Sequence, residues 1–198
     1  MGSYKRGEIK LSKTGVTEFE KEMLEQILKT ATSKALIYLQ FFIGRVLKVE
    51  SLSIRWTAQQ LKTGKDSVIS QIELREGSDL VGSIYLIFPF EIVHRLAKDM
   101  YADLIPEISQ KHVLDMAEEM TNIISAPLSE AVTFFRHTTV IPSVARIVSP
   151  DEFKSLPVTD ALVLELEIGS EMNGNIYFVM EAETVKKLKR TLKMRERE

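Results

Sequence analysis

The stretch Gly82-Ser-Ile-Tyr-Leu-Ile-Phe-Pro-Phe-Glu-Ile-Val-His-Arg-Leu96 occurs a second time, as Gly174-Asn-Ile-Tyr-Phe-Val-Met-Glu-Ala-Glu-Thr-Val-Lys-Lys-Leu188. The two copies lie 92 residues apart and share six of fifteen residues. Each copy opens with an apolar run that is typical of a buried strand, and each then changes to the spacing of a short helix. A repeat of this kind predicts that the chain consists of two copies of one structural unit.

The residues before each copy follow the same order of elements. Helical periodicity predicts long helices at 17–48 and 107–135, and short helices at 90–101 and 182–192. Alternating or apolar runs predict strands at 51–58, 67–75 and 79–89, and again at 138–149, 161–168 and 174–180. The repeated unit is therefore α-β-β-β-α, with halves at about 17–103 and 106–192.

The repeat predicts an α+β fold. Each half contributes antiparallel strands with one face to cover, and the two long helices are the elements that can cover it. We expect one antiparallel sheet packed by two long helices, with a pseudo-twofold axis between the halves. Residues 17–192 would form a single domain, between a flexible N-terminal segment at 1–16 and a charged tail at 193–198.

Composition excludes several classes of function. The chain of 198 residues has a net charge of −2 and no cysteine, which excludes thiol catalysis and disulfides and gives no reason to expect nucleic-acid binding. No apolar run reaches the roughly 18 residues of a membrane helix. The three histidines, His94, His112 and His137, are scattered, and the absence of cysteine excludes cysteine zinc sites. We expect a cytoplasmic protein that does not bind membranes.

One polar motif stands out in the second long helix, Asp115-x3-Glu119-x2-Asn122. Residues spaced four and three apart fall on one face of a helix, so these three side chains would form a polar stripe. A carboxylate can bind a cation on a partner, and a carboxamide can orient a water molecule because it both donates and accepts hydrogen bonds. Glu118 is an alternative for the carboxylate position, which shifts the register by one residue.

With this motif inside the duplicated unit, residues 17–192 resemble the CheC/CheX/FliY phosphatases of bacterial chemotaxis. The resemblance implies that the chain dephosphorylates an aspartyl-phosphorylated, CheY-like response regulator. It further implies that Glu119 contacts a lysine of the regulator and that Asn122 positions the attacking water, with Asp115 and Glu118 assigned to partner binding. The Mg²⁺ ion would be held by the regulator, and no cofactor by this chain.

The first half lacks the motif. Alignment of the long helices places Ser33, Ile37 and Gln40 opposite Asp115, Glu119 and Asn122. An isoleucine cannot bind a lysine, so the first half is expected to be catalytically silent. A single motif resembles the CheX arrangement, for which a homodimer is expected. Two other interpretations stay open. One is a non-catalytic scaffold like the middle domain of FliM, and the other is a module that only binds a regulator.

Two local features complete the predictions. Pro127 follows the motif closely and is expected to kink or break the helix, because proline removes a backbone hydrogen bond and clashes with the preceding turn. The aromatic residues Phe41, Phe42, Phe134 and Phe135 are expected to pack in the core or between helices.

Overall fold

The computed structural model describes residues 18–44, 46–57, 64, 66–101, 104–136, 138–155, 161–169, 174–181 and 184. The predicted segment at 1–16, the predicted last helix apart from Thr184, and the tail at 193–198 lie outside this range, as do the side chains of Phe134 and Phe135.

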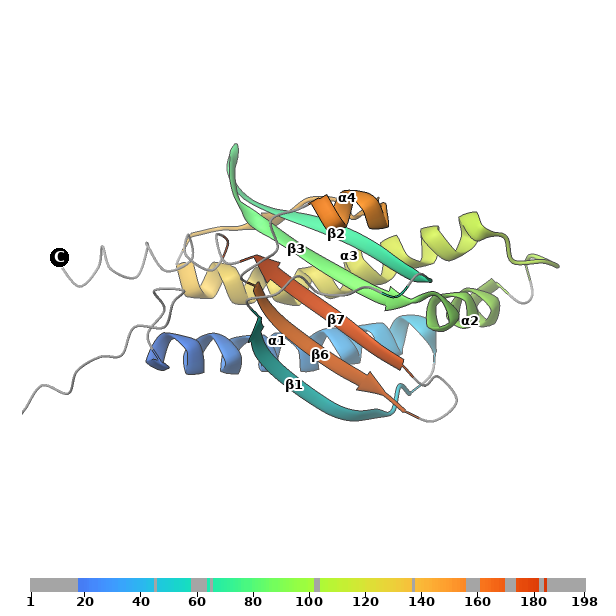
Figure 1. Cartoon of the computed structure of the whole chain (residues 1–198), viewed down its shortest axis with the longest axis horizontal. Helices are drawn as coiled ribbons and strands as arrows, with labels where there is room; N and C mark the ends of the chain where they lie inside the picture. The colour runs from blue at the N-terminus through green and yellow to red at the C-terminus, as the bar shows by residue number, and fades with distance from the viewer. Residues whose placement is uncertain are drawn as a thin grey trace, which may run out of the picture.

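The described residues form an α+β fold, as predicted from the repeat (Figure 1). The elements in chain order are α1 Glu18–Ile43, β1 Val49–Thr57, β2 Ser67–Glu76, β3 Asp79–Pro89, α2 Phe90–Tyr101, α3 Gln110–Arg136, β4 Ile141–Pro142, β5 Arg146–Val148, α4 Pro150–Ser155, β6 Ala161–Ile168 and β7 Gly174–Glu181.

Most element boundaries agree with the prediction, and the exceptions have local causes. The helix predicted to reach residue 48 ends at Ile43, because Gly44 adopts a left-handed φ of 66° that stops a helix. The single strand predicted at 138–149 is wrong, since only the short strands β4 and β5 form there. Helix α4 was not predicted, although Ser149 and Pro150 are typical helix-start residues and the Ser149 hydroxyl accepts from the Glu152 amide at 3.1 Å.

The centre of the sheet has the symmetry of the sequence repeat. The strand order is β1-β6-β7-β3-β2-β4, with β5 also paired to β2, and every pair is antiparallel. Between β3 and β7, Leu86 lies opposite Phe178, and these two residues are 92 positions apart like the repeated stretches. The next pairs outward, Tyr85–Val179 and Ile87–Tyr177, are equivalent under the same shift. The pseudo-twofold axis therefore passes through the Leu86–Phe178 pair.

The two halves exchange their first strands. Strand β1 of the first half pairs with β6 of the second half, and β5 of the second half pairs with β2 of the first half. Neither half has a complete sheet of its own, because its first strand lies beside the other half. The duplicated units therefore share one continuous sheet.

A glycine shared by the two repeats allows the halves to pack closely. A Cβ atom at Gly82 would lie only 2.0 Å from the Thr184 hydroxyl, and one at Gly174 would lie 3.0 Å from an Ile92 methyl group. Thr184 and Ile92 are themselves equivalent under the 92-residue shift. Each glycine thus leaves room for the same helical position of the opposite half.

Helices and strands form two layers, with a smaller cover on the second face of the sheet. Helices α1 and α3 lie side by side behind the sheet in the view of Figure 1, and the main core lies between them and the strands. On the opposite face, Phe153 of α4 packs edge-on against Tyr85, at 5.4 Å between ring centroids. The free side of the helix layer, away from the sheet, carries exposed residues of both helices, such as Phe41 and Glu119.

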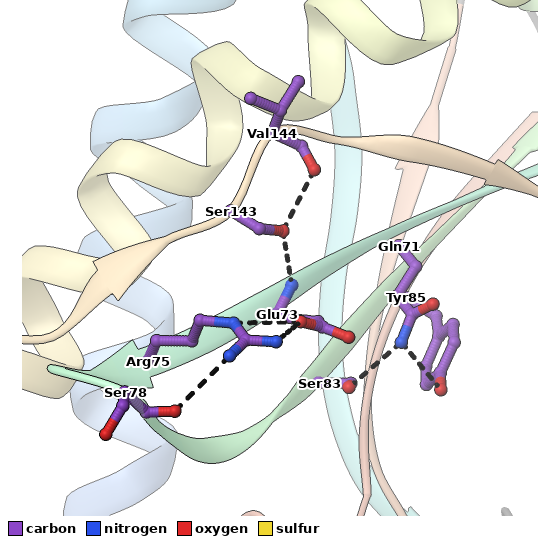
Figure 2. A network of polar contacts seen from close by, with 8 residues as sticks. All are labelled: Gln71, Glu73, Arg75, Ser78, Ser83, Tyr85, Ser143 and Val144. Atoms are coloured by element: carbon purple, nitrogen blue, oxygen red, sulfur yellow. Dashed lines mark hydrogen bonds and ion pairs between the residues drawn. The ribbon is translucent and has the colours of Figure 1, made fainter.

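The face of the sheet on which α4 lies carries a group of polar contacts in each half of the chain. The Gln71 amide donates to Ser83 at 3.0 Å and to Tyr85 at 3.3 Å, as Figure 2 shows. In the second half, the amide of Asn175 donates to Glu165 at 2.6 Å and to Tyr177 at 3.3 Å. Burial and the nearby Glu181 carboxylate raise the pKa of Tyr85, so its hydroxyl stays a donor to Glu181.

The glycine contact predicts a large effect of a small substitution. In Gly82→Ala the new methyl group overlaps Thr184, so we expect the free energy of unfolding to fall by about 2 kcal/mol. Gly64→Ala is the matched control, because its Cβ would make only an ordinary 3.4 Å contact with Ser67. Urea denaturation measures both. Equal stability of the Gly82→Ala variant and the wild type would contradict the close approach.

Candidate functional site

Helix α3 begins at a capping interaction just before the motif. The Ser109 amide donates to Nδ1 of His112 at 3.1 Å, and the Val113 amide donates to the Ser109 carbonyl at 3.3 Å. The ring of Tyr101 lies 5.9 Å from the His112 ring. These contacts fix the first turn of α3 and therefore the direction in which the following motif residues point.

The motif residues differ in their exposure. Glu119 is exposed, whereas Asp115, Glu118 and Asn122 are half-buried. The opposite side of the helix packs in the core through Met116, Met120 and Ile124. Within the described part of the chain, the Glu119 carboxylate has no hydrogen bond or ion pair, so it is available to a cation from outside.

Asn122 is held by the backbone of a distant segment. Its Oδ1 atom accepts a 2.9 Å hydrogen bond from the amide of Ala145, which follows β4. This contact fixes which end of the carboxamide faces inward. Among the described residues, Nδ2 has no partner, so two donor hydrogens remain free. The Asn122 side chain is half-buried and supports the fold.

Glu118 makes a second contact of the same kind. Its Oε1 atom accepts from the Ile147 amide at 3.3 Å, and Thr133 accepts from the Val140 amide at 2.9 Å. Asn122 and Glu118 thus bind the amides of alternate residues, Ala145 and Ile147, and Thr133 binds the amide of Val140 just before β4. An uncovered strand edge would expose such amides to other chains. Glu118 thus contacts its own chain, in addition to any part in partner binding.

The inner edge of the same segment is fixed to β2, as Figure 2 shows. The Ser143 amide donates to the Glu73 carbonyl at 2.8 Å, and the Glu73 amide donates to the Ser143 hydroxyl at 3.0 Å. The hydroxyl donates in turn to the Val144 carbonyl at 2.9 Å. Because β2 holds this segment from one side and α3 from the other, the Ala145 amide is a fixed support for Asn122.

Pro127 does not break α3. The helix runs on from Gln110 to Arg136, so of the expected kink or break at the proline, the break is wrong. The Ser125 hydroxyl donates to the Asn122 carbonyl at 2.7 Å, and the Ser129 hydroxyl donates to the Ala126 carbonyl at 2.9 Å. These serines lie on either side of the proline, and their hydroxyls add hydrogen bonds to two carbonyls that precede it, where the regular ladder is interrupted.

The aligned positions in α1 have other contacts. The Ser33 hydroxyl donates to the Lys29 carbonyl at 2.9 Å, and the Gln40 amide donates to the Leu47 carbonyl at 3.2 Å. Ile37, aligned with Glu119, is exposed. Gln40 and Asn122 thus share one task, which is to bind the backbone segment that follows their helix. The carboxylate is the part of the motif that the first half lacks.

A cleft at another place on the surface does not include the motif. It lies where β2, α2, α3 and β5 meet, and its lining includes Asp66, Phe90, Glu91, His94 and Ser149. No group of three or more potential metal ligands occurs among the residues with described positions. In that same part of the chain, no helix is both long and apolar enough to cross a membrane.

Comparison with solved structures finds one fold. No family model and no curated protein matches the sequence. The FliY structure from Thermotoga maritima has a TM-score of 0.64 at 19% identity, over 90% of this chain and 98% of that chain. The middle domain of FliM from H. pylori has a TM-score of 0.67 at 10% identity, over 89% and 99%. The chemotaxis protein CheX from Desulfovibrio desulfuricans has 0.56 at 15%, over 78% and 97%.

The chain has the CheC-like fold. Its structural neighbours include FliY, CheX and a CheC-like superfamily protein, as the sequence resemblance predicted. The neighbours also include FliM middle domains, so the fold by itself does not distinguish a phosphatase from a scaffold.

The Glu118 contact predicts an effect on stability. In Glu118→Ala the half-buried Ile147 amide loses its acceptor, so the free energy of unfolding should fall by about 1 kcal/mol. Glu118→Gln is the matched control, because its amide oxygen can still accept from Ile147. Chemical denaturation of the three proteins measures the difference. A Gln variant as unstable as the Ala variant would show that the carboxylate charge, and not the hydrogen bond, is what matters.

Proposed function

We propose that this chain is a phosphatase that hydrolyses the aspartyl phosphate of a CheY-like response regulator, in chemotaxis or another two-component pathway. The observation that carries the proposal is the pairing of an exposed Glu119 with an Asn122 whose carboxamide is held in one orientation by Ala145. The structural likeness to FliY and CheX supports it.

The proposed reaction requires little chemistry from this chain. Water attacks phosphorus in line with the bond to the aspartate, that phosphorus–oxygen bond breaks, and the products are a free carboxylate and inorganic phosphate. The Mg²⁺ on the regulator would neutralise the developing charge. What remains is to orient the water, and positioning is a large part of catalysis in phosphoryl transfer.

Asn122 suits this task because its hydrogen bond to the Ala145 amide limits the rotation of its carboxamide. With one lone pair of Oδ1 bound to the Ala145 amide, the other lone pair can accept a hydrogen bond from the water. The free Nδ2 hydrogens can donate to the water or to a phosphoryl oxygen. Glu119, one turn earlier on α3, would bind a lysine of the regulator through a charge-assisted hydrogen bond. Asp115 extends the acidic stripe in the same direction.

A scaffold that binds without catalysis is the second candidate. The hydrogen bond from the Ala145 amide to Asn122 favours the scaffold, because this structural role alone accounts for an asparagine at position 122. The FliM middle domains of similar structure point the same way. Binding of a phosphorylated regulator without faster release of phosphate would support this alternative.

We also propose that the protein is cytoplasmic and forms a homodimer. Strand β1 pairs with β6 at the end of the strand order, and strands in such edge positions can pair with a strand of another chain. Sedimentation of the purified protein measures the state of association directly.

The role of Asn122 can be separated from its structural contact. Asn122→Ala loses both the water-positioning carboxamide and the acceptor for the Ala145 amide. We therefore expect about 100-fold slower phosphate release and a loss of about 1 kcal/mol in stability. Asn122→Asp keeps an acceptor for the Ala145 amide but has no amide donor, so its stability should be close to wild type while its activity is also lost. The measurement is phosphate release from CheY-like regulators phosphorylated with acetyl phosphate in the presence of Mg²⁺.

The outcomes of this experiment are distinct. Acceleration by the wild type and by neither variant supports the phosphatase and its water-positioning residue. Wild-type rates with Asn122→Ala would exclude that role for Asn122. Failure of the wild type to accelerate release with any of several regulators would exclude the phosphatase in favour of the scaffold.

Glu119 should affect binding more than folding. Its exposed carboxylate has no partner among the described residues, so Glu119→Ala should leave the stability unchanged. We expect the dissociation constant for the regulator to rise about tenfold, because one charge-assisted contact is lost. Isothermal titration with a beryllofluoride-activated regulator measures this, with Glu119→Gln as the variant that removes only the charge. Unchanged affinity in both variants would assign the lysine contact to another carboxylate.

A further inference from the structure

Helix α1 exposes an apolar surface on the free side of the helix layer. Phe41 has 90% of its surface exposed, Ile37 has 63% and Tyr38 has 43%, although aromatic packing was expected at Phe41. That expectation is corrected for Phe41. These residues form a groove with Phe42 of α1 and with Ile123 and Ala126 of α3. We call these six residues the α1–α3 patch.

The α1–α3 patch continues the polar motif along α3. Ile123 lies one helical turn after Glu119, and Ala126 lies one turn after Asn122. A partner whose phosphorylated site reaches Glu119 and Asn122 would therefore pass over the groove with the adjoining part of its surface. The two features form one surface of α3 and do not need separate partners.

The charges around the patch are typical of a protein interface. At one end, Lys34 of α1 pairs with Glu130 of α3, and the ammonium group of Lys34 lies 5.9 Å from the centre of the Tyr38 ring. Towards the other end stands the unpaired carboxylate of Glu119. An apolar centre between charged rims is the usual composition of a docking surface. The free carboxylate requires a partner with a basic group beside its own apolar face.

The sequence repeat indicates why the patch lies on α1. Ile37 occupies the α1 position that aligns with Glu119, so the first half carries an apolar residue where the second half carries the carboxylate. An exposed helix face in a soluble protein ordinarily carries polar residues, and a contiguous apolar group marks an interaction site. The half without the motif has kept a surface for contact.

We propose that the α1–α3 patch is the docking surface for the phosphorylated receiver domain on which Glu119 and Asn122 act. An aliphatic or aromatic face of the receiver covers Ile37 and Phe41, while its basic group reaches Glu119. This inference rests on the proposed function, because the motif identifies the partner. The first half of the chain thus supplies most of the apolar contacts, and the second half supplies the motif.

The test separates binding from chemistry. Phe41→Ser and Ile37→Ser change exposed side chains, so folding should be unaffected. With a CheY-like regulator phosphorylated by acetyl phosphate, we expect KM to rise at least about tenfold while kcat stays within about twofold, since only contacts remote from the phosphoryl group are lost. Leu104→Ser is the matched control, because Leu104 is 78% exposed but lies outside the patch. Its KM should equal that of the wild type.

Binding of a beryllofluoride-activated regulator, measured by titration, adds a readout that does not depend on hydrolysis. If the wild type binds but does not hydrolyse, and Phe41→Ser weakens binding, the phosphatase fails and the docking surface stands. If the wild type hydrolyses and Phe41→Ser has a normal KM and affinity, the docking surface is overturned and the phosphatase stands. If Phe41→Ser instead dissociates a dimer in sedimentation without changing KM, the patch joins two copies of this chain and the docking proposal is overturned.

Discussion

The structure depends on the antiparallel pairing of β3 with β7. This pairing sets Leu86 opposite Phe178 and so fixes the pseudo-twofold axis on which the other elements are arranged. The close approach of each half to the other is possible only because Gly82 and Gly174 carry no side chain at that point. Once the axis is set, each half completes its part of the sheet with the first strand of the other half, through β1 on β6 and β5 on β2. Helices α1 and α3 then lie together on one face of the sheet, where residues of both helices line one groove.

Much of this arrangement could be predicted from the sequence, because the signals are local and occur twice. The 92-residue shift that relates the repeats is the same shift that relates Leu86 to Phe178 in the sheet. Helix α2 and strands β3 and β6 begin and end where the periodicity places them. The errors come from tertiary contacts. The segment at 138–149 has the composition of a strand, but its middle turns to bind both Glu73 and Asn122, so only short strands remain. Pro127 has a strong intrinsic tendency to break a helix, yet packing of α3 against α1 and the sheet overrides it.

The candidate site was predictable in its residue types and spacing but not in its structural support. Nothing in the sequence around Asn122 indicates that its carboxamide binds the amide of a residue 23 positions later. The same holds for Glu118 and Ile147. These contacts arise from the position of the β4–β5 segment beside α3, which depends on the exchange of strands between the halves. Asn122 supports the β4–β5 segment, and the same hydrogen bond orients its carboxamide, so no second side chain is needed for that purpose. Replacement of Asn122 therefore also lowers the stability of the fold.

The central claim is that Glu119 and Asn122 act together at the aspartyl phosphate of a receiver domain, with the carboxamide held by Ala145. A crystal structure of this chain in complex with a beryllofluoride-activated, Mg²⁺-bound CheY-like regulator tests this most directly. The account predicts the Asn122 carboxamide beside the beryllofluoride group, a regulator lysine at Glu119, and an unbroken hydrogen bond from the Ala145 amide. A regulator bound to another face of the molecule, with Asn122 remote from its phosphorylation site, would contradict it.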